Sequence, residues 1–257
     1  MKKTLSIIFV AVLLGSCNTY DRYKTAVLWI AISNEDVPKI QELIKSGFDV
    51  NASINGLTPL IFATSMGKIP IMKILLESKA DPNQISELGE TALSSAVRLR
   101  DKDLCAEVVK VLIDAGADVN MKTPEEIPII SQAVFNGNPY AIKVLVEAKA
   151  DVNAQIDSST PLMFAALRSM YTSDQQTHKE VVEALLEAGA NPKLKNSEGD
   201  TAADIALKAE KRALEYAARI NDKIISGTDQ NEAHESLENA KFAKEIYYIL
   251  KKAEEKE

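Results

Sequence analysis

Ala150-Asp151-Val152-Asn153, followed seven residues later by Thr160-Pro161-Leu162, is the stretch that decides the fold of this chain of 257 residues. Both phrases recur along the sequence. The first recurs at 48–51, 80–83, 117–120 and, in a weaker form, 190–193. The second marks helix starts at 58–60, 91–93, 128–130 and 201–203. An alanine follows each start, at Ala63, Ala96, Ala133, Ala165 and Ala206, and Ala31 fits the same frame. These alanines are 32, 33, 37, 32 and 41 residues apart, which indicates a repeat of about 33 residues with insertions in two units.

Each recurring residue type has a physical role in such a repeat. A threonine such as Thr58 or Thr160 accepts hydrogen bonds from free amides at a helix start, where the following proline loses no needed donor. Glycine ends the preceding helix at Gly47, Gly116 and Gly189, where a left-handed backbone is favoured. Lys79 and Lys149 replace it in two units, at an expected cost of about 1 kcal/mol each. Asp and Asn then form the tight turn into the next unit.

A 33-residue period with Thr-Pro-Leu and Gly-Ala-Asp-x-Asn resembles the ankyrin repeat, and the resemblance covers residues 25–205. It implies an all-α repeat solenoid of helix–turn–helix units joined by β-turn or hairpin loops, about six in number. Neighbouring units stack to bury the apolar faces that no single unit buries alone. The family's usual histidine after Thr-Pro-Leu is absent, so we expect lower local stability than in a consensus array. Its place is taken by Ile61, Ser94, Ser131, Met163 and Asp204.

Insertions occur between the first and second helices of three units. They amount to four residues around 100–103, eight around 170–177, and about thirty-two in the last unit. The sequence therefore predicts two long helices over 202–225 and 232–256, joined by 226–229. With charged outer faces, residues 206–257 are expected to complete the last repeat as a helical C-terminal cap.

The first residues have the pattern of an export signal. Lys2 and Lys3 precede an apolar stretch, residues 5–14, that is too short to span a bilayer. Leu14-Gly15-Ser16-Cys17 resembles a bacterial lipobox, which implies a signal peptide over 1–16 and a diacylated Cys17. Residues 17–24 are then the lipidated cysteine and a tether to the bilayer. Asn18 after the cysteine resembles an outer-membrane signal, so we expect a lipid-anchored envelope protein that faces the periplasm or the cell surface. An ordinary secretory signal near a cysteine is the alternative.

Composition and motifs argue against catalysis and nucleic-acid binding. The net charge is −7 without a basic block, which is unfavourable for binding phosphates. The sequence contains no recognisable nucleophile–base pair, metal-ligand cluster or glycine-rich phosphate loop. His178 and His234 are expected to be solvated surface groups, and Cys105 a structural or idle thiol. We therefore expect no enzyme activity, no cofactor, no metal and no small-molecule substrate.

Protein binding is the remaining class, and the resemblance places it on the hairpin tips and on the exposed ends of the first helices. The candidate tip residues are Ile54, Leu57, Ile85, Leu88, Met121 and Ile156. The candidate helix-end residues are Met66, Leu99, Phe135 and Leu167, flanked by Arg98 and Arg168 for pairing with a partner's carboxylates. Met66 and Phe135 are expected to be exposed, whereas Leu57 and Leu88 are as readily explained as core between repeats. The edge formed by the insertions, with Tyr171, is a second candidate site.

The expected function is thus that of a membrane-anchored, non-catalytic protein–protein interaction module of the cell envelope. One alternative is an immunity or inhibitor protein that occludes a toxic enzyme acting on the envelope. A second is a passive scaffold that organises envelope proteins. The inhibitor alternative rests on composition alone, namely an acidic array tethered to a membrane, and the partner's identity is not encoded in any motif.

Overall fold

The computed structural model describes residues 19–53, 56–168, 174–224 and 230–256. Cys17 and the expected signal peptide lie outside these ranges. The chain divides into two compact units, of which Asp118 ends the first and Val119 begins the second. In the described stretches the regular structure is helical, with two isolated β-bridges and no strand. The predicted all-α repeat fold is therefore confirmed.

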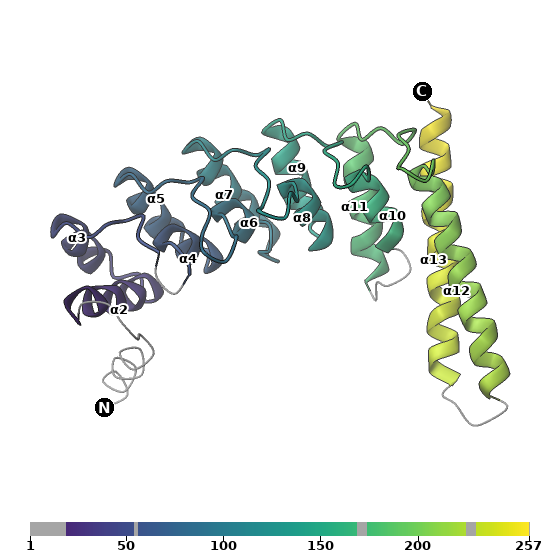
Figure 1. The fold of residues 1–257 in the computed structure, drawn as a ribbon, viewed down its shortest axis with the longest axis horizontal. Coiled ribbons are helices and arrows are strands. Elements are labelled where there is room, and N and C mark those ends of the chain that lie inside the picture. Colours follow the sequence, from purple (N-terminus) through teal and green to yellow (C-terminus); the bar gives the residue numbers. More distant parts are fainter. Residues whose placement is uncertain (1–18, 54–55, 169–173, 225–229, 257) are drawn as a thin grey trace. The chain divides into compact units, whose positions relative to one another are not determined.

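The described residues of the first unit form three helix pairs (Figure 1). Their bounds are α2 Thr19–Ser33, α3 Val37–Lys45, α4 Pro59–Ser65, α5 Ile69–Glu77, α6 Ala92–Ala96 and α7 Lys102–Asp114. First helices pack on first helices, α2 on α4 and α4 on α6, and the second helix α5 packs on α7. This is the stacking that the 33-residue period predicts.

In the part of the second unit that the structure describes, two helix pairs are followed by a pair of long helices (Figure 1). Their bounds are α8 Ile129–Phe135, α9 Pro139–Glu147, α10 Pro161–Arg168, α11 Gln175–Glu187, α12 Ala202–Ile224 and α13 Gln230–Glu255. Helix α12 packs on α10, and α13 returns over α11. The long helices thus match the expected 202–225 and 232–256 within a few residues.

Helix α2 begins earlier than the sequence reasoning placed it. It starts at Thr19, whereas residues 18–24 were expected to be a tether and the repeats to begin at 25. No proline or glycine interrupts residues 19–24, so the helix extends N-terminally without a backbone penalty.

The recurring alanines are core residues at the contacts between helices. Five of them are completely buried: Ala63, Ala96, Ala133, Ala165 and Ala206. Ala31 of α2 is almost as inaccessible, which agrees with its place in the first repeat. A methyl group at these points lets first helices of adjacent repeats approach closely, and larger side chains would overpack the contact.

Lysine occupies a left-handed position at two helix ends. Lys79 and Lys149 have φ angles of 72° and 68°, close to the 82° of Gly47 at the matching place. The left-handed backbone that the sequence reasoning assumed is therefore confirmed, and each lysine is strained by its Cβ atom.

The Asp-x-Asn phrase links neighbouring repeats through asparagine. Asn83 donates from Nδ2 to the carbonyl oxygen of Gly116 at 2.9 Å, and its Oδ1 accepts from the amide of Asp118 at 2.7 Å. The same Oδ1 contact joins Asn51 to Asp81, Asn120 to Asp151 and Asn153 to Asn191. Sequence reasoning assigned these residues to the turn alone. The structure shows that each asparagine also fixes the turn of the following repeat.

Residues at the family's histidine position complete the helix caps in three repeats, through an oxygen atom in two of them and through the sulfur of Met163 in the third. Ser94 accepts from the amide of Thr91 at 2.9 Å, while Thr91 Oγ1 accepts from the amide of Ser94 at 3.0 Å. Asp204 makes the equivalent exchange with Thr201. The Thr201 amide and hydroxyl hold the pKa of Asp204 below its usual value. This contact therefore contributes its full stability above the usual pKa of an aspartate, and the stability is lost as pH falls through the lowered pKa.

The repeat that begins at Pro128 lacks this cap. Pro128 has no side-chain acceptor and no N–H, and the buried Oγ of Ser131 has no hydrogen-bond partner among the described residues. Its backbone is extended, as it is at Thr91, so a threonine fits there without strain. We expect Pro128→Thr to raise the free energy of unfolding by about 1 kcal/mol. Urea unfolding measures this, and Thr91→Pro as the reverse change should destabilise; a neutral or destabilising Pro128→Thr would contradict the assignment.

Candidate interaction surface

The tip between α5 and α6 holds two exposed apolar side chains on a rigid turn. Ile85 is exposed, and Leu88 has 63% of its surface accessible. The buried Ser86 fixes the turn, because its Oγ accepts from the amides of Leu88 at 3.2 Å and Glu90 at 3.1 Å. Leu88 also lies over Gly56, where an added Cβ would be 2.9 Å from Leu88 Cγ. The side chain therefore covers the preceding tip and still presents most of its surface to solvent.

The other predicted tip residues differ in accessibility. Leu57 is half-buried in the first unit, as are Met121 and Ile156 in the second. Ile54 lies outside the described residues. Of this set, the tip formed by Ile85 and Leu88 thus offers the largest apolar area that the structure describes.

The ends of the first helices in the first unit are partly exposed. Met66 caps α4 and is exposed as predicted, with Sδ accepting a long contact of 3.9 Å from the Ser33 hydroxyl. Leu99, the residue at the matching place one repeat later, is half-buried. Met66 is therefore the accessible member of this pair.

Arg98 is already paired within the chain. Its guanidinium donates to Glu90 Oε1 at 2.7 Å and to Ser95 Oγ at 3.1 Å. The role predicted for it, pairing with a partner's carboxylate, would require it to leave or share Glu90. The arginine joins the helix end to the tip loop. Arg168 ends α10, and its side chain lies outside the description.

In the second unit, one predicted helix-end residue is exposed and the other packs in an aromatic pair. Leu167 is exposed, as predicted. Phe135 was expected to be exposed and is half-buried instead, because its ring meets that of Phe164 edge-on with 5.1 Å between centroids. This geometry is favourable for aromatic rings and removes area that a partner would otherwise bury.

Sequence reasoning missed several apolar residues whose side chains are half-buried or exposed. Phe62 and Phe164 hold the same place, one residue before the fixed alanine, and Phe62 packs edge-on against Trp29 with 3.7 Å between centroids. Leu207 and Leu214 are exposed on α12. Their seven-residue spacing, two turns of one helix face, was a signal that could have found them.

One predicted surface group is buried. His178 was expected to be solvated, yet only 4% of it is accessible, and its ring lies 5.7 Å from that of Phe242, centroid to centroid. Helix α13 covers α11 at His178. No pattern in the sequence indicates this contact between the two helices. His234 is exposed and Cys105 is buried, with its Sγ 3.5 Å from the carbonyl oxygen of Ala96.

The described part of the chain contains no group of three or more histidine, cysteine or acidic residues arranged to hold a metal ion. None of its helices combines the length and the apolar character needed to cross a membrane. The candidate interaction surface consists of exposed apolar side chains, two of them on a hydrogen-bonded turn.

Comparison with known families agrees with the repeat geometry. A family model described as ankyrin repeats (3 copies) matches residues 7–86, 28–123, 93–196 and 130–225. The chain belongs to the ankyrin-repeat family. Ankyrin repeats are protein–protein interaction modules and are generally non-catalytic. The chain is thus a protein–protein interaction module of a generally non-catalytic family.

Similar proteins share the repeats over part of their length. "Ankyrin repeat, SAM and basic leucine zipper domain-containing protein 1" of Carollia perspicillata is 30% identical over 113 residues, and that of Atelerix albiventris 34% over 114. Each alignment covers 44% of this chain and 24% of the relative, so the chain matches about a quarter of those proteins. The crystal structure of the ankyrin repeat protein EF0377 has a TM-score of 0.60 at 23% identity, covering 72% of this chain and 92% of that one. That likeness concerns the fold.

Proposed function

We propose that the chain is a lipid-anchored interaction module of the bacterial cell envelope, which holds a partner protein on the tip and helix-end surface of its first unit. This surface comprises Ile85, Leu88 and Met66. The observation that carries the proposal is that these three large apolar side chains stay exposed in the folded chain. Exposed apolar patches mark interaction sites, and these three are the exposed large apolar side chains of the first unit in the described residues.

The surface has the physical properties of a binding site. Full burial of a leucine or methionine side chain stabilises a complex by about 1.5–3 kcal/mol relative to exposure. The Ser86 hydrogen bonds hold the tip in place before binding, so little conformational entropy is lost when a partner orders it. Arg98 and Glu90 provide a polar edge beside the apolar residues.

Anchoring at Cys17 would restrict the partner to the region next to the bilayer. Two or three acyl chains hold a protein stably, whereas one does not. In the sequence, Asn18 alone separates Cys17 from the start of α2, so the first repeat follows the anchor almost directly. This supports a partner that is itself at, or attached to, the envelope.

Cross-linked capture from membranes tests the function. We expect the full-length chain to capture a discrete partner, and Met66→Glu with Leu88→Glu to reduce the yield at least about tenfold, because two carboxylates must then be desolvated. The matched control is Leu207→Glu with Leu214→Glu on α12, where the exposed fractions are 45% and 46%. The control should capture normally.

A further arm separates anchoring from binding. Cys17→Ser should release the protein from the membrane fraction and leave binding to the purified partner unchanged. Equal capture by both glutamate pairs would contradict the proposed surface, and Cys17→Ser protein that remains in the membrane fraction would contradict the anchor. The identity of the captured partner then distinguishes an inhibitor from a scaffold.

A further inference from the structure

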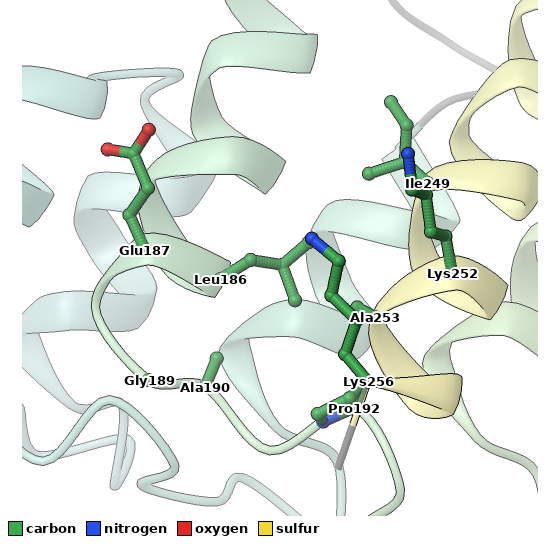
Figure 2. A pocket seen from close by; sticks show the side chains of 9 residues that line it. All are labelled: Leu186, Glu187, Gly189, Ala190, Pro192, Ile249, Lys252, Ala253 and Lys256. Atoms are coloured by element: carbon green, nitrogen blue, oxygen red, sulfur yellow. The ribbon is translucent and has the colours of Figure 1, made fainter.

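An apolar groove of about 420 Å³ lies between α11 and the end of α13 in the second unit. Its floor and walls are formed by Leu186, Ala190, Pro192, Ile249 and Ala253. Figure 2 shows Leu186 entering from α11, the turn with Ala190 and Pro192 below it, and Ile249 and Ala253 on the facing side of α13. The groove lies between second helices of the second unit, whereas the surface proposed above belongs to the first unit.

The walls of the groove are held by hydrogen bonds. The amide of Ala190 donates to the carbonyl oxygen of Leu185 at 2.9 Å, and the Asn191 amide donates to Oδ1 of Asn153 in the preceding repeat at 2.9 Å. Outside the residues that line the groove, α13 is also tied to α11 by the ion pair of Lys179 and Glu245 at 2.5 Å. A ligand therefore meets a preformed cavity and does not have to order it.

The rim of the groove is positively charged on an otherwise acidic chain. Lys252 and Lys256 border it, and Figure 2 shows the Lys256 side chain running from the end of α13 toward Leu186. Neither ammonium group lies within ion-pair distance of a carboxylate in the described residues. The acidic residue at the rim, Glu187, is paired with Lys143 at 3.3 Å. Two lysine ammonium groups thus border an apolar floor, on a chain that carries a net charge of −7.

We propose that this groove docks a segment of a partner protein in which an apolar side chain is flanked by carboxylates. The apolar side chain fills the space between Leu186 and Ile249 and gains affinity from buried area. The carboxylates pair with Lys252 and Lys256, which fixes the orientation of the segment and favours acidic over basic partners. This site is additional to the tip surface, and neither depends on the other.

A displayed library of random twelve-residue peptides provides the probe. It is selected on the immobilised full chain, and the peptides retained by wild type are compared with those retained by Lys252→Glu with Lys256→Glu. The matched control is Lys211→Glu with Arg212→Glu on α12, which makes the same change in net charge at exposed positions outside the groove.

We expect the peptides that the groove variant loses, and the control keeps, to combine a large apolar residue with aspartate or glutamate. The affinity of such a peptide, measured by fluorescence anisotropy, should fall about tenfold or more in the groove variant and weaken with added salt. Selection of basic or uncharged peptides, no enrichment, or equal losses in both variants would overturn the proposal. Met66→Glu with Leu88→Glu should leave this affinity unchanged, so failure here is distinguishable from failure of the tip surface.

Discussion

Replacing Asn83 by alanine is expected to lower the free energy of unfolding by about 2 kcal/mol. The amide side chain makes two hydrogen bonds to the next repeat, from Nδ2 to Gly116 and from Asp118 to Oδ1. Alanine removes both and leaves the carbonyl and the amide of the turn without these partners. The loss is therefore larger than for an ordinary surface substitution, which changes stability by about 0.5 kcal/mol or less.

Urea unfolding followed by circular dichroism measures this change. Asn136→Ala is the matched control, since Asn136 Nδ2 donates to the carbonyl oxygen of Gln132 at the end of α8, a contact within one repeat. We expect the control to cost about 0.5 kcal/mol or less. If Asn83→Ala were no more destabilising than Asn136→Ala, the cross-repeat role of the Asp-x-Asn phrase would be wrong.

Replacing Ala213 by leucine is expected to destabilise the C-terminal hairpin by about 2 kcal/mol. Ala213 is buried where α12 faces α13, together with Ala209 and Ala217 one turn to either side. The Ser236 hydroxyl of α13 donates to the Ala213 carbonyl oxygen at 2.8 Å, so the helices are close at this point. A leucine must push α13 away or adopt a strained rotamer, and the separation would also break the Ser236 bond.

Hydrogen exchange of α12 and α13 and thermal unfolding test this expectation. Ala218→Leu introduces the same side chain at an exposed position of the same helix and should be nearly neutral. Faster exchange confined to the hairpin in Ala213→Leu would identify the alanine seam as the contact that holds the cap. Equal behaviour of the two variants would show that the seam tolerates a larger residue.

The fold was predictable from sequence because its signals are local and repeated. Thr58, Thr91, Thr160 and Thr201 each accept a hydrogen bond at a helix start, as their position before an apolar helix indicates. The alanine at the fixed position is buried in each repeat. Repetition compares five or six copies of one pattern, so a position that is ambiguous in one copy is resolved by the others.

The features that sequence reasoning missed depend on contacts between distant segments. His178 is buried by Phe242, 64 residues later, because α13 folds back over α11. Phe135 loses exposure to Phe164 of the next repeat, and Arg98 is engaged by Glu90 across its own repeat. None of these contacts has a periodic signature, so the accessible part of the candidate surface required the three-dimensional structure.

The most direct test of the central claim is photo-cross-linking in intact cells, with a photoreactive phenylalanine analogue placed at one position at a time. The claim is that the tip and helix-end surface contacts another protein at the envelope. We predict that the analogue at position 88 or 66 gives a discrete cross-linked product, and that the analogue at 207 or 214 gives none of that product. A product formed from 207 or 214 and absent from 88 and 66 would contradict the claim and place the interaction on the C-terminal hairpin.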